Sequence, residues 1–353
     1  MWAGVATGGA GLAMFISAPF WGMLADRWGR KPMLLRAQFG GAVVVALYIF
    51  VPNVFVFLGF RVLQGLFTGT VSAASALVAT NTPRDKLPLT MGTLLGAIYA
   101  GFTLGPLAGG FLADNFGFSV TFAITSLLLL CGGLVILFFA SENFQRPAPG
   151  QRTSLNSMMK LAFSREIFPL LLVVSVLNLG PQIVQPILPL IIGQISPTGD
   201  AASYSGLALG LNGIVAAVSA FAIGRFGRGI PVRNILIVCC VGTGILYLGP
   251  FWASSITQLI LFIGLTGLLS GGIVTSANSL VGLSVPVAQQ GIAYGLSQSA
   301  NSLGSGVGPF IGGGLAPVIG LRPIFLVTAG VFLLVGLVAM KLLPAKPASA
   351  PAK

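Results

Sequence analysis

The sequence lacks histidine altogether, and only 7% of its 353 residues are charged. A soluble domain carries roughly a quarter charged residues, so water would not solvate a surface built from this chain. The absence of histidine removes the commonest general base and metal ligand. The three cysteines, Cys131, Cys239 and Cys240, all lie inside apolar runs, where cysteine usually acts as a small apolar filler. We therefore expect no metal site.

The sequence also lacks recognisable catalytic motifs. No stretch matches the GxxxxGK[ST] pattern of a phosphate-binding loop, which argues against ATP-driven work by this chain. We find no grouping of nucleophile, base and acid. We therefore expect that the protein is not an enzyme and that it needs no cofactor.

Apolar runs are what the sequence has in abundance, since 55% of the residues are hydrophobic and the mean hydropathy is +0.97. A helix needs ~20 apolar residues to cross the hydrocarbon layer of a membrane. Breaks at charged residues, proline and glycine divide the chain into eleven such spans, which predicts an all-α membrane protein. The expected spans are 3–24, 34–52, 55–80, 88–113, 118–140, 167–193, 203–224, 233–252, 256–282, 288–316 and 322–342.

Lysine and arginine are distributed unequally between the loops. One alternating set of loops, together with the C-terminal tail, is rich in both, whereas the opposite set holds only Arg322. Cytoplasmic loops are enriched in Lys and Arg, so we predict that the basic set faces the cytoplasm. The net charge of +12 then serves topology and contact with anionic lipid rather than nucleic-acid binding. The basic loops carry Arg27, Arg30, Lys31, Arg36, Arg84, Lys86, Arg146, Arg152, Lys160, Arg165, Arg225, Arg228 and Arg233.

An internal repeat divides the chain into two related halves. The pattern GxxxGPxxGG occurs at Gly101–Gly110 and again 203 positions later at Gly304–Gly313. Arg27–Arg30 is similarly echoed by Arg225–Arg228. Six expected spans fall in the second half and five in the first. We therefore expect that the first half lacks its first helix.

The only long polar connector, Ser141–Arg165, marks the boundary between the halves. We predict an N-terminal bundle over 1–140 with helices equivalent to 2–6 of a six-helix unit, and a cytoplasmic linker over 141–165. A C-terminal six-helix bundle follows over 166–343, and 344–353 forms a cytoplasmic tail.

The first basic loop contains the segment GMLADRWGRK, Gly22–Lys31. Its glycines permit a tight turn, and Asp26 can face a helix N-terminus. A simple basic anchor is the alternative interpretation, but it would not need Asp26 or Gly29. We therefore expect this loop to do more than anchor the chain.

Arg61 lies inside the third span and is followed by Gln64 and Gly65. An arginine within a span usually faces a cavity, and we favour that interpretation. The alternative is that Arg61 extends to the outer interface, since Pro52 and Asn53 are close in sequence.

These segments resemble signatures of the major facilitator superfamily. Gly22–Lys31 resembles its GxLaDrxGRk loop, and Arg61–Gly65 resembles its RxxqG motif. GxxxGPxxGG is similar to the signature of the twelve-helix drug:proton antiporters, and Pro19–Gly22 and Glu142–Gln145 resemble segments of bacterial multidrug exporters. The resemblance covers essentially the whole chain. It implies two pseudo-symmetric helix bundles, with five helices visible in the first and six in the second.

The resemblance also implies roles for particular residues. The loop of Asp26, Arg27 and Arg30 would latch the outward-facing state, and Arg61 would assist proton coupling. Proline and glycine within a helix bend it and let backbones touch, so the two glycine–proline motifs would be gating elements. Their residues are Gly101, Gly105, Pro106, Gly109, Gly304, Gly308, Pro309 and Gly312.

The sequence departs from the family pattern at two places. The family's first helix, which often carries an acidic residue, is not visible, and Thr80 occupies a position where many members have an acid. No Asp or Glu lies near the middle of a span. A proton would then titrate a group at a span end, such as Asp26 or Asp114, unless a further helix carries the acid or coupling is lost. Asp114 has the alternative interpretation of an interfacial helix cap.

Uncharged polar residues cluster on single faces of three spans. Such stripes should face protein or a water-filled cavity. Hydrogen bonding between helices is the alternative. For the stripe that contains Asn178 and the stripe that contains Asn301 we favour a cavity, and for the stripe of Asn278 both interpretations stay open. Pro181, Pro186 and Pro189 would break the helix of the first stripe. The candidate cavity residues are Asn178, Gln182, Gln185, Asn278, Tyr294, Gln298 and Asn301.

These observations predict a secondary transporter of the bacterial inner membrane that exports amphipathic small molecules by alternating access. The family resemblance implies proton antiport, so protons, substrate and lipid are the expected partners, and we expect a monomer. The alternatives are a uniporter or metabolite importer of the same fold, or a truncated product that does not transport.

Overall fold

The computed structural model describes residues 2–67, 69–82, 86–142, 155–165, 167–195, 200–226, 230–285 and 290–342. These ranges are almost wholly helical and contain no β-strand. Eight helical segments in them are long and apolar enough to cross a membrane, judged by length and composition. One of the eight, Gly96–Phe139, has 44 residues, enough for two crossings. The all-α membrane fold expected from the sequence is confirmed.

The helices follow one another along the chain without intervening sheets. They are α1 (Trp2–Trp28), α2 (Arg30–Leu47), the 3-10 helix η1 (Tyr48–Phe50), α3 (Val54–Phe67), α4 (Thr70–Asn81), α5 (Leu87–Phe139), α6 (Leu155–Ala162), α7 (Phe168–Val184), α8 (Leu188–Ile195), α9 (Ala201–Phe226), α10 (Val232–Trp252), α11 (Ile256–Leu283), α12 (Gln290–Ile319) and α13 (Pro323–Leu342). Every expected span coincides with one or two of these helices. The linker, expected as a loop, contains the short helix α6.

Two expected spans merge into α5, which changes direction at one residue. Gly117 has φ 81° and ψ 165°, a backbone conformation that glycine adopts without steric cost. The limb before it packs on α9, and the limb after it packs on α2, where Ser126 Oγ donates to the carbonyl oxygen of Ala42 at 2.8 Å. One glycine thus replaces a loop between two spans.

Prolines divide the first span of the second half into α7 and α8. The break covers residues 185–187 and includes Pro186, as expected. Pro181 was also expected to break the helix, but it lies inside α7 without ending it. Pro189 is the second residue of α8, where a missing N–H costs no helical hydrogen bond.

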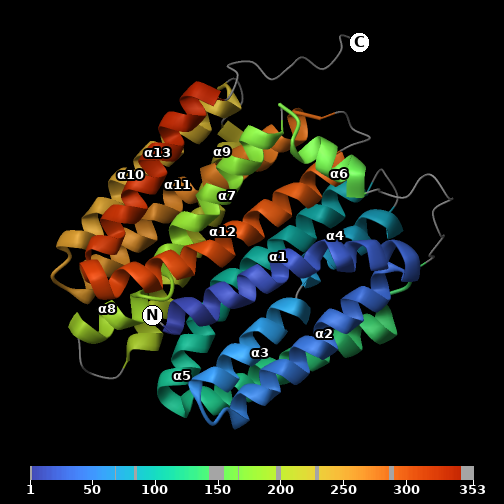
Figure 1. Cartoon of the computed structure of the whole chain (residues 1–353), viewed down its shortest axis with the longest axis horizontal. Coiled ribbons are helices and arrows are strands. Elements are labelled where there is room, and N and C mark those ends of the chain that lie inside the picture. Colours follow the sequence, from blue (N-terminus) through green and yellow to red (C-terminus); the bar gives the residue numbers. More distant parts are fainter. Residues whose placement is uncertain are drawn as a thin grey trace.

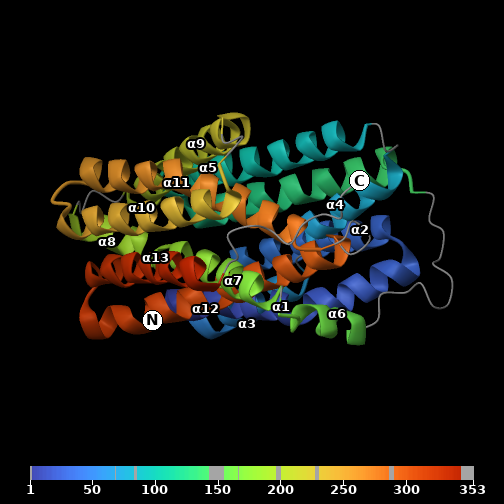
Figure 2. The same cartoon turned by 90° about the horizontal axis from the view of Figure 1, so that it is seen from above.

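Figure 1 shows α1–α5 and α7–α13 as two groups of helices that lie side by side, with α1 next to α12 along their boundary. Figure 2, turned by 90°, shows α5 and α9 on one side of the molecule and α1 and α12 on the other. α1 begins close to α8, whereas α13 ends at the opposite end of the molecule. Opposite ends are what an odd number of crossings requires.

The second half has the larger buried core. It is formed by side chains that are almost fully buried, among them Ile183, Leu236 and Phe325. The buried cluster of the first half is small and centres on Val44, Val45 and Tyr48. Many large apolar side chains outside these clusters are exposed. Lipid tails are as apolar as leucine, so a membrane helix can leave such side chains exposed without the cost that water would impose.

Candidate functional site

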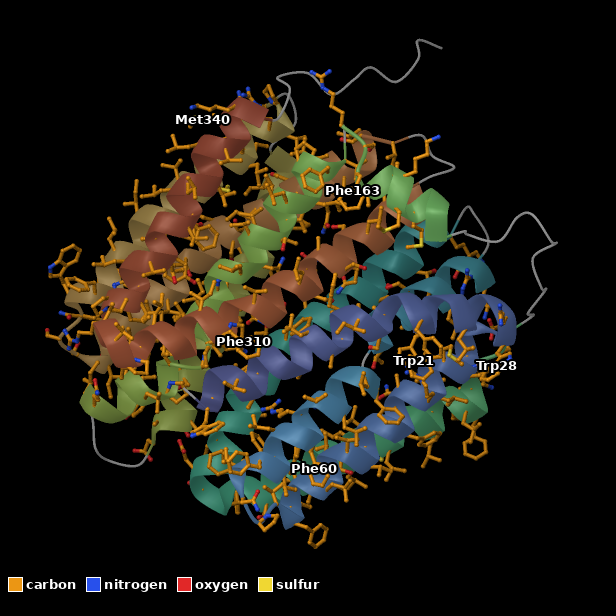
Figure 3. The ribbon with its side chains drawn as sticks, viewed as in Figure 1. Trp21, Trp28, Phe60, Phe163, Phe310 and Met340 are labelled. Carbon is orange, nitrogen blue, oxygen red and sulfur yellow. The ribbon has the colours of Figure 1, made fainter. Side chains whose placement is uncertain are left out.

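The first contact between the halves runs between α1 and α12. A Cβ on Gly4 would overlap with the carbonyl oxygen of Pro309. A Cβ on Gly8 would overlap with the ring of Phe310, which Figure 3 shows at the boundary of the two helices. Gly11 lies equally close to the backbone of Gly306. Small residues allow helices in a membrane to approach this closely. We call this contact the α1–α12 seam.

The second contact, the α5–α9 seam, is built in the same way. A Cβ on Gly206 would overlap with the carbonyl oxygen of Pro106, and a Cβ on Gly210 would overlap with the side chain of Leu107. Glycine again lies where the backbone or side chain of the facing helix leaves no room for Cβ.

The two seams repeat each other in register. Contact positions on α5 and α12 differ by 203, and their partners on α9 and α1 differ by 202. The sequence repeat therefore extends to individual contacts between the halves, and the two seams form a pseudo-symmetric pair. The matched contacts are Gly206 on Pro106 with Gly4 on Pro309, Gly210 on Leu107 with Gly8 on Phe310, and Gly213 on Thr103 with Gly11 on Gly306.

The α5–α9 seam ends in a polar contact. The carboxylate of Asp114 accepts a hydrogen bond from the backbone N–H of Ser203 with a donor–acceptor distance of 2.6 Å. The Ser203 hydroxyl donates to the carbonyl oxygen of Gly110 at 3.3 Å. The carboxylate thus caps a helix, as one interpretation of Asp114 expected, but the capped helix is α9 of the other half.

The other faces of the two glycine–proline helices differ sharply. On α12, a Cβ on Gly304, Gly308 or Gly312 would overlap with the backbone or side chains of α7. A Cβ on Gly308, for example, would lie 2.7 Å from Gln182 Cβ. The corresponding face of α5, at Gly101, Gly105 and Gly109, has no described atom within 4 Å. Close packing, expected for both motifs, is therefore found for the glycines of the second motif. For Gly101, Gly105 and Gly109 that expectation is wrong among the described residues.

Both seams lie towards the same end of the molecule. Their contacts use the first half of α1 and of α9, and the parts of α5 and α12 that face them. We call this the outer end, following the orientation predicted from the Lys/Arg-rich loops, and the end with Arg27 and Arg225 the basic end. Gly22, Gly96 and Gly295, in the basic-end parts of α1, α5 and α12, have no described atom within 4 Å of a Cβ position. The glycine contacts that join the halves therefore close the outer end.

The first basic loop is a single residue, because α1 ends at Trp28 and α2 begins at Arg30. Gly29 between them has φ 98°, and a Cβ there would lie 2.8 Å from Glu142 Oε2. The Glu142 carboxylate accepts hydrogen bonds from the backbone N–H groups of Arg30 and Lys31, at 2.7 and 2.8 Å. A carboxylate at a helix N-terminus is favourable, so Glu142 caps α2.

The proposed latch residues are placed only in part. Arg27 is exposed in the last turn of α1, and the backbone N–H of Arg30 bonds to Glu142 within the first half. The side chain of Asp26 lies outside the part of the chain that the structure describes. The sequence indicated Glu142 only as part of a segment that resembles the family. Its role as a cap of α2 could be recognised only from the folded structure.

Arg61 is half-buried on α3. Its Nη1 donates to Gln64 Oε1 at 3.3 Å, and that oxygen also accepts from the Tyr48 hydroxyl at 2.7 Å. The guanidinium lies 5.6 Å from the ring centre of Tyr48 and 5.2 Å from that of Phe57, within cation–π range. Its Nε is buried without a hydrogen-bond partner in the described residues. Arg61 is thus held by neutral groups of the first half.

The polar stripes are divided between helix contacts and a small cavity. Asn178 donates to Asn301, so this pair joins α7 to α12. Gln298 is half-buried, Asn278 is exposed on α11, and the side chain of Tyr294 lies outside the described residues. For Asn178 and Asn301, the structure shows the interhelical bond that was the alternative interpretation.

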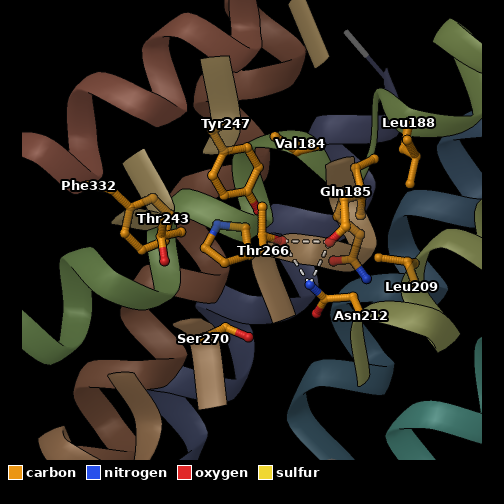
Figure 4. Close-up of a pocket in the computed structure, with 12 residues that line it drawn as sticks. Val184, Gln185, Leu188, Leu209, Asn212, Thr243, Tyr247, Thr266, Ser270 and Phe332 are labelled. Carbon is orange, nitrogen blue, oxygen red and sulfur yellow. Dashed lines mark hydrogen bonds between the residues drawn. The ribbon is translucent and has the colours of Figure 1, made fainter. Parts of the chain in front are cut away.

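Gln185 lines a cavity of about 70 Å³ inside the second half (Figure 4). Asn212 donates from Nδ2 to Thr266 Oγ1 at 2.8 Å and to the carbonyl oxygen of Ile263 at 2.9 Å. Tyr247 lies beside these hydrogen bonds (Figure 4). The volume is enough for a few water molecules but not for a drug-sized compound. Sequence reasoning missed Asn212 and Thr266, although a lone polar residue in a span is the available signal.

Comparison with known proteins places the chain among membrane transporters. A family profile described as Major Facilitator Superfamily matches residues 2–228 and 170–353. Multidrug resistance protein MdtG of Salmonella arizonae is 33% identical over 335 residues, which are 94% of this chain and 83% of that protein. MdtG of Klebsiella pneumoniae is 34% identical, with 94% and 81% covered.

Two solved structures share the fold. The human organic anion transporter MFSD10 (TETRAN) has a TM-score of 0.71 at 22% identity, covering 95% of this chain and 83% of that one. A bacterial homolog of the human lysosomal transporter Spinster, in an inward-facing and occupied conformation, has a TM-score of 0.81 at 14% identity, covering 99% and 91%. At these identities, the likeness supports the fold alone.

Proposed function

The chain belongs to the major facilitator superfamily, and from this premise we propose that it exports amphipathic organic compounds across the bacterial cytoplasmic membrane by alternating access. It is a multi-pass membrane transporter and not an enzyme. Relatives about one-third identical over nearly the whole chain carry the name multidrug resistance protein, which supports this substrate class.

The observation that carries alternating access is the pair of matched seams at the outer end. In both seams, glycines of one half lie against the backbone or a side chain of the facing helix, so the halves can separate without breaking interlocked pairs of large side chains. Two related bundles joined at one end can pivot about a central path. In the opposite state, Asp26, Arg27 and Arg30 would join the basic ends of the two halves.

Proton antiport is the proposed driving force, and it rests on the family. Glu142 is engaged as a helix cap at the basic end, and Asp114 is engaged at the outer end. Arg61 is a charged group held at part-buried depth among neutral partners, and we propose that it assists proton movement.

Reconstitution tests this function directly. Purified protein in liposomes should expel a lipophilic fluorescent cation faster when a pH gradient is imposed, and a protonophore should remove the difference. Liposomes without protein are the control. Dye efflux at equal rates with and without the pH gradient would favour a uniporter. Dye movement in the same direction as the protons would favour an importer. No movement of any dye, with protein correctly inserted, would contradict the export proposal.

We further propose that a transmembrane helix equivalent to α7 covers the face of α5 at Gly101, Gly105 and Gly109. The support is the repeat, because the matching face of α12 is covered by α7. We likewise propose that the first bundle ends at residue 140, the linker at 165 and the second bundle at 343. Fusing the corresponding helix of a close relative ahead of Trp2 should raise dye efflux per inserted molecule. Equal efflux from the 353-residue chain and the fusion would contradict it.

The orientation of the molecule is proposed from the Lys/Arg-rich loops and can be tested separately. Single cysteines at positions 30 and 152 should resist a membrane-impermeant maleimide in whole cells, and a cysteine at position 200 should react. Reaction at 30 or 152 without reaction at 200 would reverse the assignment.

A further inference from the structure

The first turn of α9 exposes backbone N–H groups that have no partner within the helix. α9 begins at Ala201, and the N–H of Ser203 is one of these groups. Its partner is the Asp114 carboxylate, at 2.6 Å, from α5. Asp114 is half-buried, and the two residues belong to different halves of the molecule. This bond requires that the two halves touch along the α5–α9 seam.

Among the residues that the structure describes, the α1–α12 seam has no equivalent of this bond. The residue on α12 that corresponds to Asp114 in the 203-residue repeat is Pro317, whose side chain cannot accept a hydrogen bond. Three glycine contacts are otherwise matched between the two seams. The carboxylate is therefore an addition to one of two similar contacts rather than part of the repeated packing.

The added bond differs in kind from the rest of the seam. Glycine–backbone contacts gain dispersion energy, which lipid or other atoms can largely replace when the seam opens. A hydrogen bond to a carboxylate is stronger than one between neutral groups, and the partial positive charge of a helix N-terminus adds to it. A contact that exists in one state only shifts the equilibrium by its full differential strength.

We propose that Asp114 holds the outer end closed by capping α9 across the α5–α9 seam, so that loss of its carboxylate moves the transporter towards the outward-open state. Asp114 is a positioning residue in this scheme, since it acts through the seam and not on substrate. The proposal rests on the proposed alternating access. Its test below uses no substrate, so it can fail independently of the export proposal.

The test reports whether the seam is open. Thr103 is buried in the α5–α9 seam, and Thr103→Cys is a conservative reporter in a chain with Cys131→Ala, Cys239→Ala and Cys240→Ala. In whole cells, an impermeant maleimide should label this reporter thiol slowly. Adding Asp114→Ala should raise the labelling rate about tenfold, the effect of losing one charge-assisted hydrogen bond. Asp114→Asn should fall between, because an amide oxygen still accepts but carries no charge.

Asn115 supplies the matched control. It is the next residue of α5, it is exposed, and its amide donates to the carbonyl oxygen of Phe111 in its own helix at 2.9 Å. Asn115→Ala should leave labelling of the reporter thiol unchanged. Size-exclusion chromatography should show that the Asp114→Ala and Asn115→Ala proteins are both folded. Equal labelling of the reporter thiol in these two proteins would then overturn the proposal.

A second pair of variants tests the other end of the bond. Ser203→Pro removes the N–H that donates to Asp114, in the first turn of α9 where proline is tolerated. Ser203→Ala removes only the hydroxyl that donates to Gly110. Ser203→Pro should raise labelling of the reporter thiol as Asp114→Ala does, the double variant should add nothing further, and Ser203→Ala should have a smaller effect. Additive effects of Asp114→Ala and Ser203→Pro would show that the two groups act separately, contrary to the proposal.

Discussion

The α1–α12 and α5–α9 seams use the same glycine positions and the same helix register, yet they differ in two respects. The α5–α9 seam adds the Asp114 carboxylate, and α5 is bare, among the described residues, on the face that α12 turns towards α7. Repetition of a sequence thus reproduced the backbone contacts between the halves but not the polar contacts or the helix coverage. The comparison teaches that the glycine contacts between the halves are symmetric, whereas the Asp114 hydrogen bond and the covering of the outer faces of α5 and α12 are not.

The largest effect is expected when a seam glycine is replaced by a residue with a large side chain. Gly206→Leu and Gly4→Leu should each separate the halves at the outer end, because overpacking against a carbonyl group costs roughly 1–3 kcal/mol and more where backbone must move. Labelling of a cysteine at position 103 should rise strongly in both. Gly101→Leu is the control, since no described atom lies within 4 Å. An effect of only one of the two seam variants would break the symmetry.

A somewhat smaller effect should separate the covered and uncovered faces. Gly308→Leu would collide with Gln182 on α7, so it should lower thermal stability in detergent by the equivalent of about 1–3 kcal/mol. Gly105→Leu, at the matching position of α5, should change the melting temperature little. If a fused helix covers α5 as proposed, Gly105→Leu should become as harmful as Gly308→Leu. Equal losses in the 353-residue chain alone would contradict the difference between the faces.

The basic end offers a comparison of a similar kind. Glu142 caps α2 in the first half, whereas the position 203 residues later is Ala345, which has no carboxylate. Glu142→Ala should cost about 0.5–2 kcal/mol of stability, the usual range for losing a helix cap. Urea or thermal unfolding in detergent measures the loss, and Glu142→Gln should recover part of it. A loss restored fully by Gln would mean that the charge of Glu142 is unimportant.

The smallest effect is expected at the polar contact between α7 and α12. Asn178 bonds to Asn301, and the residue equivalent to Asn301 in the first half is Ile98. Asn178→Leu combined with Asn301→Leu should change stability by no more than ~0.6 kcal/mol, the average for hydrogen bonds between membrane helices. A double-mutant cycle measures the coupling. A coupling several times larger would mean that this pair, and not the glycine face, holds the two helices together.

Sequence reasoning was most successful where one physical rule dominates. Length and apolarity predicted eleven spans, because a membrane requires a helix wherever ~20 apolar residues run together. The described parts of these spans are helical, and eight helical segments, one of them long enough for two crossings, are long and apolar enough to cross a membrane. The glycine–proline repeat correctly predicted close contact at Gly308. For Gly105 no described atom lies within 4 Å of a Cβ position, because a small residue shows that a helix can approach but does not show which helix does.

Site residues were harder to predict because their roles depend on partners distant in sequence. Asp114 was expected either to titrate or to cap a helix, and the structure shows its carboxylate capping a helix of the other half that begins at Ala201. Glu142 and Gly29 meet only after α1, α2 and the second limb of α5 have packed together. Asn178 and Asn301 were assigned to a cavity, but their spacing on a helix face could not distinguish a cavity from a neighbouring amide.

The sequence by itself determined that the chain lies in a membrane, where its helices run, and that it consists of two related halves. Hydrophobicity, helix length and repetition can be read from the chain without knowing which residues become neighbours. It also carried the family resemblance, in motifs such as Gly22–Lys31. Only the tertiary structure decided which face of each glycine-rich helix is covered, which end of the molecule the seams close, and which carboxylates cap which helices. Those outcomes depend on the relative placement of whole helices, where contacts of a few ångströms join residues that are distant in sequence, as for Arg30 and Glu142.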